Sequence, residues 1–374
     1  MLSRVLIAGG GTGGHLYPGL AIAERLRSLG AECRFVGTRR GLEARVVPER
    51  GFPLHTIHAR GLAGKPWQKL LAIATLGRGF LESLWILHRY RPQMMVVTGG
   101  YVCAPILLAS ALRRTPVLML EQNALPGKVN RKLAGLARRI CLSFDESRKF
   151  FPSSRCVLTG NPVREEILSA TREQGREFFK IPDDRPALLV TGASQGASSI
   201  NEAILKALAN WRASGHNWTI LHLTGTAHQS KVQEKARQIL QDSMLDYRCI
   251  GYMGEMHFAY AAADLVVSRA GATTLAELTA RGLPSILIPY PFSADRHQDF
   301  NADTLVQRGA ALKLDDSAVG ELLGDTVGSL MEDSQRLGKM AQASLASGRP
   351  EALHAILEVI EQNFGAVATK SPLG

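Results

Sequence analysis

A histidine follows a glycine-rich stretch near the N-terminus, and this pairing suggests both anion binding and proton transfer. Residues 9–14 read Gly-Gly-Gly-Thr-Gly-Gly, follow an apolar run and lead directly into His15. Glycines let backbone N–H groups approach a ligand, and the helix N-terminus expected here attracts negative charge. A histidine at a helix N-terminus tends to stay neutral and accepts a proton near pH 7. His15 is therefore a candidate general base. A turn without a ligand, and a histidine that only packs or caps, are the alternatives.

The same glycines admit a second interpretation. Gly9, Gly11 and Gly14 match the G-x-G-x-x-G pattern of dinucleotide-binding folds, which is a weak signal alone. A nicotinamide site would need an acidic residue at the end of the second strand, where residues 38–40 read Thr-Arg-Arg instead. These residues argue against NAD and leave NADP open, so an NADP-dependent oxidoreductase is a rival class.

Two further small-residue turns follow apolar runs in the second half of the chain. Residues 191–197 read Thr-Gly-Ala-Ser-Gln-Gly-Ala, in which Ser194 can donate a hydrogen bond to a phosphate oxygen. Residues 268–277 read Ser-Arg-Ala-Gly-Ala-Thr-Thr-Leu-Ala-Glu, where a threonine at 273 or 274 is expected to cap a helix. Glu277 falls about one turn inside that helix, and its carboxylate can accept two hydrogen bonds from a diol such as a ribose. An anion-binding turn beside such an acceptor predicts a nucleotide site. An ordinary turn and a solvated helix charge are the alternatives.

Three more polar loops also follow apolar runs. They are Thr-Gly-Gly-Tyr at 98–101, Glu-Gln-Asn at 121–123 and Asp-Arg-His-Gln at 295–298. Ligands of open α/β sheets bind beyond the carboxyl ends of the strands. We therefore expect all these loops to line one crevice between two domains.

Strand-like apolar runs alternate with helical periodicity along the chain. Helices are predicted over 18–29, 200–211 and 351–364. Strands are predicted over 5–8, 33–36, 94–97 and 117–120 and, after a break near 158–165, over 187–191, 219–223, 249–250, 265–267 and 286–288. This alternation predicts an α/β chain with two consecutive, Rossmann-like doubly wound domains.

Charge is distributed unevenly between the two halves. Residues 1–160 contain 24 Lys and Arg against 8 Asp and Glu, a net of +16, whereas residues 161–374 contain 20 against 25, a net of −5. A basic front half suits nucleic acid, an anionic membrane or a phosphorylated substrate. Residues 93–112 are uncharged, but Gly-Gly and a proline interrupt them, so they predict a strand, loop and helix rather than a membrane span.

The cysteines indicate neither disulfides nor zinc. They are odd in number, scattered and never arranged as C-x-x-C: Cys33, Cys103, Cys141, Cys156 and Cys249. This usage fits a reducing cytosolic setting, and no signal peptide is recognised at the N-terminus.

Seven motifs occur in an order that is typical of a known family. They are Gly-Gly-Thr-Gly-Gly-His at 10–15, Thr-Gly-Gly-Tyr at 98–101, Glu-Gln-Asn at 121–123, Gly-Asn-Pro-Val-Arg at 160–164, Ser-Gln-Gly-Ala at 194–197, Arg-Ala-Gly-Ala-Thr-Thr at 269–274 and Asp-Arg-His-Gln at 295–298. Each motif alone is weak, but the set is specific and covers nearly the whole chain. As a set the motifs closely resemble those of the bacterial cell-wall N-acetylglucosaminyltransferases.

The resemblance implies the two-domain glycosyltransferase B fold and a defined reaction. N-acetylglucosamine would pass from UDP-N-acetylglucosamine to the 4-hydroxyl of the muramoyl sugar of undecaprenyl-diphospho-N-acetylmuramoyl-pentapeptide, which converts lipid I to lipid II in peptidoglycan synthesis. The linkage changes from α to β, so the reaction is inverting. No cofactor and no tightly bound metal are implied, and the chain has no Asp-x-Asp pair suited to one.

The resemblance also divides the chain by role. Residues 1–160 would form the acceptor- and membrane-facing domain, with helix 351–364 packed back on it, and residues 161–350 would bind the donor. By position, the donor-contacting residues would be Thr12, Gly13, Gly14, Asn123, Arg164, Ser194, Met253, Ala272, Thr273, Thr274, Leu275, Ala276, Glu277 and Gln298.

Within these sets the resemblance implies particular roles. Glu277 would accept the ribose hydroxyls, and the helix N-terminus before it would face the diphosphate. His15 would take the proton of the acceptor hydroxyl, with Tyr101, Glu121 and Asn123 orienting the acceptor.

Two positions depart from the family pattern. Ala193 stands where glycine is common, a change that we expect to be small. Leu120 stands where a histidine is often found, so a second histidine in the acceptor site is not expected.

The resemblance further implies a peripheral protein on the cytoplasmic face of the bacterial inner (plasma) membrane, without a nucleic-acid partner. Between Lys65 and Arg91, apolar and basic residues interleave in a way that suits an anionic membrane surface, although some of them must be core. The residues of this segment are Trp67, Lys69, Leu70, Leu71, Ile73, Leu76, Phe80 and Trp85. Two rival functions stay open beside this one: a related lipid or sterol glycosyltransferase, and a nucleotide-sugar-binding protein without catalysis.

Overall fold

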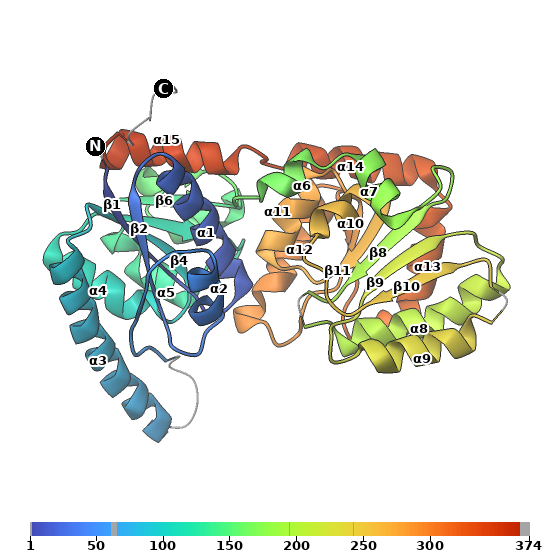
Figure 1. Ribbon diagram of the computed structural model, residues 1–374, viewed down its shortest axis with the longest axis horizontal. Coiled ribbons are helices and arrows are strands. Elements are labelled where there is room, and N and C mark those ends of the chain that lie inside the picture. The colour runs from blue at the N-terminus through green and yellow to red at the C-terminus, as the bar shows by residue number, and fades with distance from the viewer. Residues whose placement is uncertain (1, 61–65, 194, 242, 367–374) are drawn as a thin grey trace. The chain divides into compact units, whose positions relative to one another are not determined.

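The chain folds into two compact α/β units (Figure 1). The computed structural model describes residues 2–60, 66–193, 195–241 and 243–366, and only the backbone of residues 66–73. Unit 1 comprises Met1–Pro162 with Glu351–Gly374, and unit 2 comprises Val163–Pro350.

Unit 1 is a seven-stranded parallel sheet in the order β3-β2-β1-β4-β5-β6-β7. Its strands are β1 (Arg4–Gly9), β2 (Glu32–Gly37), β3 (Leu54–Thr56), β4 (Met94–Gly99), β5 (Val117–Glu121), β6 (Arg139–Leu142) and β7 (Cys156–Leu158). Its α-helices are α1 (Gly13–Ser28), α2 (Glu43–Glu49), α3 (Pro66–Tyr90), α4 (Cys103–Arg113), α5 (Lys128–Leu133) and α15 (Ala352–Phe364), and short 3-10 turns cover Ala134–Leu136, Asp145–Phe150 and Ser153–Arg155.

The apolar strands of unit 1 bury both of their faces. Val5 and Ile7 point into a core shared with α1 and α15, whereas Leu6 and Ala8 point into a core shared with α3 and α4. Successive strand residues face opposite sides of a sheet, so a continuous apolar run such as β1 requires helices on both faces. Ile356 and Ile360 of α15 complete the first core, so the last described helix belongs to unit 1.

Unit 2 is a six-stranded parallel sheet in the order β10-β9-β8-β11-β12-β13. Its strands are β8 (Ala187–Thr191), β9 (Thr219–Leu223), β10 (Asp246–Ile250), β11 (Leu265–Ser268), β12 (Ser285–Leu287) and β13 (Ala311–Lys313). Its helices are α6 (Glu165–Ser169), α7 (Arg172–Phe179), α8 (Ser198–Ala213), α9 (Gln229–Ile239), α10 (Met256–Ala262), α11 (Ala272–Ala280), the 3-10 turn Ala294–Arg296, α12 (His297–Gln307), α13 (Val319–Met331) and α14 (Ser334–Ser347).

Both sheets have a topological switch point, where the strand order reverses. In unit 1 it lies between β1 and β4, and in unit 2 it lies between β8 and β11. Loops at the carboxyl ends of the two strands diverge there, which opens a ligand crevice. The fold therefore directs attention to the loops after β1, β4, β8 and β11, which carry motifs singled out from the sequence.

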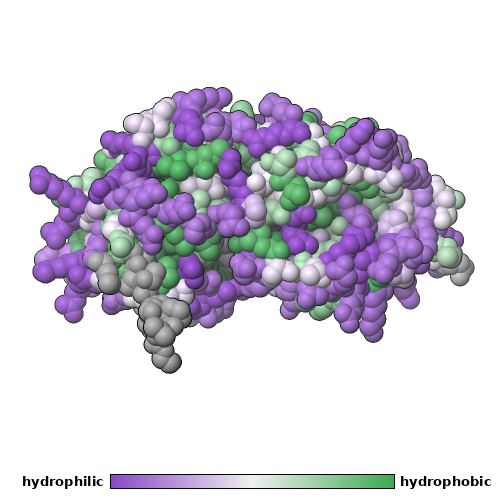
Figure 2. Space-filling view, turned by 90° about the horizontal axis from the view of Figure 1, so that it is seen from above, coloured by the Kyte–Doolittle hydropathy of each residue, from purple (hydrophilic) through white to green (hydrophobic). Residues whose placement is uncertain are grey.

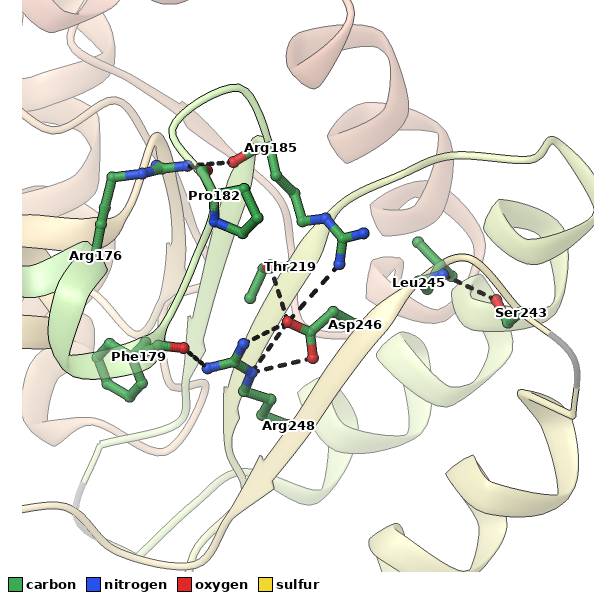
Figure 3. A network of polar contacts seen from close by, with 9 residues as sticks. All are labelled: Arg176, Phe179, Pro182, Arg185, Thr219, Ser243, Leu245, Asp246 and Arg248. Atoms are coloured by element: carbon green, nitrogen blue, oxygen red, sulfur yellow. Dashed lines mark hydrogen bonds and ion pairs between the residues drawn. The ribbon is translucent and has the colours of Figure 1, made fainter.

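A network of hydrogen bonds and ion pairs stabilises the outer strand β10 of unit 2 (Figure 3). Both carboxylate oxygens of Asp246 accept hydrogen bonds from the Arg248 guanidinium at 3.0–3.1 Å, and Thr219 donates to Asp246 at 3.1 Å. Arg248 also donates to the carbonyl oxygen of Phe179 at the end of α7. The network thus joins β9, β10 and α7.

The surface carries the polar residues. On the face shown in Figure 2, hydrophilic residues cover most of the area, and smaller hydrophobic areas lie between them. Among the described residues, no helix is both long and apolar enough to cross a bilayer.

Candidate functional site

His15 lies in the first turn of α1, at the switch point of unit 1. Its Nδ1 atom is 3.0 Å from the carbonyl oxygen of Thr98 at the end of β4 and 3.3 Å from Oε1 of Gln122 after β5. Both partners are acceptors, so Nδ1 carries the proton and donates it. The neutral ring then has its lone pair on Nε2, which is the atom a general base uses.

Gly99 leaves room for the histidine ring. A Cβ atom at this position would lie 2.6 Å from Nδ1 and 2.7 Å from Cε1 of His15. The backbone of Gly99 also has φ +115°, which side chains disfavour. The ring orientation therefore depends on a glycine here.

A buried carboxylate accepts a hydrogen bond from the glycine-rich loop. Glu43 at the start of α2 is fully buried and accepts hydrogen bonds from the backbone N–H of Gly11 at 2.9 Å and of Thr38 at 2.8 Å. Burial alone would raise the pKa of Glu43, but these hydrogen bonds hold it below its usual value. A side chain would collide with this carboxyl group at three glycines: Gly10, Gly37 and Gly41. Glu43 thus joins the loops after β1 and β2.

Glu121 holds a neighbouring loop in place. Its side chain is 1% exposed; Oε1 accepts from the backbone N–H of Asn123 at 3.0 Å, and Oε2 accepts from Asn130 at 2.8 Å and from Gly127 at 3.3 Å. Burial raises the pKa of Glu121 against the opposing effect of these hydrogen bonds. The carboxylate is enclosed by its own loop, so it shapes the presentation of Asn123.

The remaining expected residues of unit 1 belong to the loops that also hold His15 and its partners Thr98 and Gln122. Thr12 is the exposed N-cap of α1 in extended conformation, and Gly13 and Gly14 form the first turn. Tyr101 follows β4 and is 62% exposed, whereas Asn123 is 9% exposed. The helix predicted from Pro18 begins five residues earlier, at Gly13, and this extension places His15 inside it.

In unit 2 the stretch Ala272–Glu277 lies within α11, at the switch point. Gly271 is the N-cap of α11, and no side chain caps the helix. The prediction that a threonine caps it is therefore wrong: Thr273 and Thr274 lie inside the first turn, half-buried. Glycine is among the residues favoured at an N-cap, and here it precedes the threonines, so the helix begins before them.

Glu277 is the buried acceptor of this helix. It is 7% exposed; Oε1 lies 3.3 Å from the Arg164 guanidinium, and Oε2 accepts a hydrogen bond from the Tyr260 hydroxyl at 3.0 Å. Burial raises the pKa of Glu277, while Arg164 and Tyr260 act against that rise. Two residues that the resemblance assigned to the donor, Arg164 and Glu277, are thus in contact.

Arg269 anchors the loop before α11. Its guanidinium is almost buried and donates to the carbonyl oxygen of Ile288 at 3.2 Å, to Asp316 at 2.5 Å and to the Ser199 hydroxyl at 3.1 Å. These partners follow β12, follow β13 and begin α8. One cation therefore fixes three loop ends at the carboxyl edge of the sheet.

Gln298 and Met253 occupy other loops of this edge. Gln298, in the first turn of α12, accepts a hydrogen bond from the backbone N–H of Tyr290 at 2.9 Å. Met253 follows β10 and is 9% exposed. Within the described part of the chain, neither side chain bonds to another expected site residue. Ser194 lies outside the described residues.

Ala193 has a larger structural consequence than the sequence suggested. Its φ is +65°, the left-handed region in which glycine is at ease. A residue with a Cβ costs about 1–2 kcal/mol there. The loop after β8 therefore carries backbone strain next to the expected phosphate-binding position.

Sequence reasoning missed several residues that shape these sites. Gln122 lies inside a recognised motif, but its contact with His15 links loops more than 100 positions apart. Tyr260 lies in an ordinary apolar helix, and Glu43 follows a basic loop, so neither gives a local signal. Among the described residues, no group of three or more His, Cys, Asp or Glu is arranged to hold a metal ion.

Comparison with known proteins first defines the class. Residues 5–142 match the glycosyltransferase family 28 N-terminal domain, and residues 187–356 match the glycosyltransferase family 28 C-terminal domain. The structure of Acinetobacter baumannii MurG has a TM-score of 0.81 at 29% identity and covers 96% of this chain and 99% of that chain. CalG4, the calicheamicin glycosyltransferase, has the same fold, with a TM-score of 0.68 at 16% identity, and covers 97% of this chain and 99% of that one. The two parallel α/β sheets are thus those of a glycosyltransferase of the B fold, as predicted.

Relatives with higher sequence identity define the family within this class of glycosyltransferases. The UDP-N-acetylglucosamine--N-acetylmuramyl-(pentapeptide) pyrophosphoryl-undecaprenol N-acetylglucosamine transferase of Desulforudis audaxviator is 46% identical over 373 residues, which is 97% of this chain and 99% of that protein. The transferase of the same name from Moorella thermoacetica is 44% identical and covers 96% of this chain and 98% of that protein. The chain belongs to this family of N-acetylglucosamine transferases. The resemblance seen in the motifs is confirmed, and the oxidoreductase alternative is removed.

Proposed function

We propose that this chain is an inverting transferase that makes lipid II. It moves N-acetylglucosamine from UDP-N-acetylglucosamine to the 4-hydroxyl of the muramoyl sugar of undecaprenyl-diphospho-N-acetylmuramoyl-pentapeptide, in peptidoglycan synthesis. Family membership over nearly the full length supports the reaction. The observation that carries the chemistry is His15, whose Nδ1 donates to Thr98 so that Nε2 is the basic atom.

On the donor side, unit 2 supplies the groups that a UDP-sugar needs. The N-terminus of α11, with Thr273 and Thr274 in its first turn, suits the diphosphate, because the helix dipole and N–H groups favour negative charge. Glu277 accepts the ribose hydroxyls. As the bond to the sugar breaks, negative charge builds up on UDP, and the same helix end stabilises it.

On the acceptor side, unit 1 supplies the base. Nε2 of His15 takes the proton of the 4-hydroxyl while that oxygen bonds to the anomeric carbon of N-acetylglucosamine. The bond from this carbon to UDP breaks on the opposite face, and UDP leaves with the electron pair. Attack opposite the leaving group converts the α linkage into a β linkage. Tyr101 and Asn123 orient the acceptor, and Glu121 holds the loop of Asn123.

The activity is tested with the purified full chain, UDP-N-acetylglucosamine and the lipid-linked muramoyl-pentapeptide in detergent. We expect disaccharide-linked lipid and UDP in equal amounts. Absence of both products, with the acceptor soluble and the chain folded, would refute the proposal.

The base is tested with His15→Gln. We expect kcat to fall about 100-fold or more, because a positioned base contributes about that factor. UDP affinity should change little, since the groups proposed to bind the ribose and the diphosphate, Glu277 and the N-terminus of α11, lie in unit 2. His354→Gln on α15, an exposed histidine of the same unit, is the control and should keep full activity. An unchanged rate and pH–rate profile in His15→Gln would remove His15 from the base role.

Unit 1 also carries the proposed contact with an anionic membrane surface. Leu81 and Trp85 of α3 are 66% and 61% exposed, and Leu112 of the adjoining α4 is 67% exposed. Exposed arginines lie beside them: Arg78, Arg89, Arg113 and Arg114. Exposed apolar side chains with exposed arginines on the same helices suit the interface of a bilayer with anionic headgroups. These side chains support the proposal of a peripheral protein at the cytoplasmic face of the inner membrane.

Exposure narrows the choice of residues for the proposed contact. Phe80 is half-buried and packs against the core, and Leu76 is half-buried as well. The side chains of Trp67, Lys69, Leu70, Leu71 and Ile73 lie outside the described residues. Trp85 is therefore a better probe of membrane contact than Phe80.

A further inference from the structure

The proposed ribose acceptor Glu277 needs support that its own helix does not provide. Its carboxyl group is 7% exposed, so it has lost most of its contact with water. A buried carboxylate is costly unless hydrogen-bond donors or cations compensate it. Two groups do so: the Arg164 guanidinium at Oε1 and the Tyr260 hydroxyl at Oε2.

The two supports differ in rigidity. The Arg164 side chain is 36% exposed and 3.3 Å away, and it precedes the short helix α6. Tyr260 is 3% exposed on α10, and its hydroxyl lies 3.0 Å from Oε2. Burial and the adjacent carboxylate raise the pKa of Tyr260, so the phenol stays protonated and can only donate to the carboxylate. Among the described residues, the Tyr260 hydroxyl forms a hydrogen bond only with Glu277.

We infer that Tyr260 is a positioning residue for donor selection: its hydroxyl holds the Glu277 carboxylate so that the remaining lone pairs meet a vicinal diol. This deepens the proposed function, because it rests on Glu277 binding the ribose of UDP. A carboxylate with one oxygen held by a fixed donor cannot rotate freely, so the orientation is set before the nucleotide arrives. The structure thereby favours ribonucleoside diphosphates over nucleotides that lack the diol.

The same contact opposes the protonation of Glu277. Burial raises the pKa of Glu277, and Arg164 and Tyr260 oppose that rise. These are the charged and titratable groups that face it; α12 and α14, which also pack on α11, add none among the described residues. Loss of the Tyr260 hydroxyl removes one opposing contribution, so the carboxyl becomes protonated at a higher pH. A protonated carboxyl is a poorer acceptor for a diol.

The test compares two ligands on the full chain by calorimetry: UDP and 2′,3′-dideoxy-UDP. The wild type should bind UDP more tightly. In Tyr260→Phe the affinity for UDP should fall about tenfold, the effect of one hydrogen bond to a charged group, while dideoxy-UDP binds as before. As the pH is lowered from 8 to 5.5, UDP affinity should be lost at a higher pH in the variant than in the wild type.

Two further variants make the result specific. Tyr247→Phe removes the hydroxyl of a half-buried tyrosine of the same unit, where it bonds to His222, and should leave the ratio of the two affinities unchanged. Tyr260→His keeps a ring with an N–H donor and should recover part of the discrimination, and it serves as the second test if the Phe variant does not fold. In a Glu277→Gln background, Tyr260→Phe should have no further effect on UDP binding.

The outcomes separate the inference from the function it rests on. If the wild type binds both nucleotides equally, the assignment of Glu277 to the ribose fails. If the wild type discriminates, and Tyr260→Phe and Tyr260→His discriminate by the same factor with the same pH dependence, the role of Tyr260 fails alone.

Discussion

Three glutamates lie buried at the candidate sites, and their neighbours decide what each can do. Glu43 and Glu121 use their oxygens to hold loops, through N–H groups of Gly11, Thr38 and Asn123. Glu277 has a cation and a phenol beside it rather than a closed cage of backbone donors. A carboxylate whose oxygens accept hydrogen bonds from nearby loops stabilises those loops. A carboxylate whose partners are one guanidinium and one phenol can still accept hydrogen bonds from a ligand.

The sequence marks the residues proposed to carry the chemistry more clearly than those that position them. His15, Glu277 and their loops stand in short motifs whose residue types limit what they can do. The partners come from other elements: the sheet brings Thr98 and Gln122 close to His15, and helix α10 carries Tyr260 to Glu277. Long-range contacts of this kind leave no local pattern in a single sequence.

Gly99→Ala tests whether the ring orientation of His15 matters. The new methyl group would lie 2.6 Å from Nδ1, so the imidazole has to move. We expect kcat to fall between about 10- and 100-fold, because a misplacement of about 1 Å can cost that much. UDP affinity should stay at the wild-type value.

Gly30→Ala is the matched control for this change. Gly30 also has positive φ, +95°, but no atom lies within 4 Å of the added Cβ. The two variants share backbone strain and differ in contact with His15. Equal losses of kcat in both would mean that strain, rather than displacement of the histidine, explains the result.

At the scale of elements, continuous apolar runs were the reliable signal. The central strands β1, β4, β5, β8, β9 and β11 are buried on both faces and were predicted nearly as observed. The short strands β3, β6, β7 and β13 were missed, because they are only three or four residues long, and β3, β7 and β13 are also partly exposed. Strand β10 was predicted only in part, since its charged first half is stabilised by the Arg248–Asp246 pair rather than by apolar burial.

This pair makes the stability of unit 2 depend on pH. Burial alone would raise the pKa of Asp246, but hydrogen bonds and charge from Arg248 hold it below the usual value. A lowered folded-state pKa stabilises the fold above the pKa of the unfolded chain, about 4, and that contribution is lost as the pH falls through the folded-state pKa. Asp246→Asn should therefore destabilise unit 2 by about 1–3 kcal/mol at pH 7.

Thermal unfolding at several pH values checks this prediction. The difference in melting temperature between wild type and Asp246→Asn should be largest near pH 7 and shrink towards pH 3. Glu234→Gln, which removes an exposed partner of Arg237 on α9, is the control and should melt like the wild type. A deficit in Asp246→Asn that is the same at pH 7 and pH 3 would contradict the electrostatic explanation.

For the whole molecule, each half of the chain carries its own sheet, switch point and charge. Residues 1–160 have a net charge of +16, and residues 161–374 have a net charge of −5. The UDP groups are assigned to the acidic half, where a helix N-terminus and local loops supply the positive potential. The excess positive charge of the front half suits the proposed contact with an anionic membrane that carries the lipid acceptor.

Membrane contact by unit 1 predicts a salt-sensitive and residue-specific association with vesicles. The full chain should sediment with vesicles rich in anionic phospholipid and much less with neutral ones, and added salt should weaken the association because it screens the arginines. Trp85→Ala removes an aromatic side chain that is 61% exposed on α3, so binding should fall several-fold. Leu345→Ala, on α14 of unit 2, removes an apolar side chain that is 59% exposed and should bind like the wild type. Equal binding by the wild type and Trp85→Ala would show that α3 does not make the contact, and equal losses in both variants would assign it to general surface hydrophobicity.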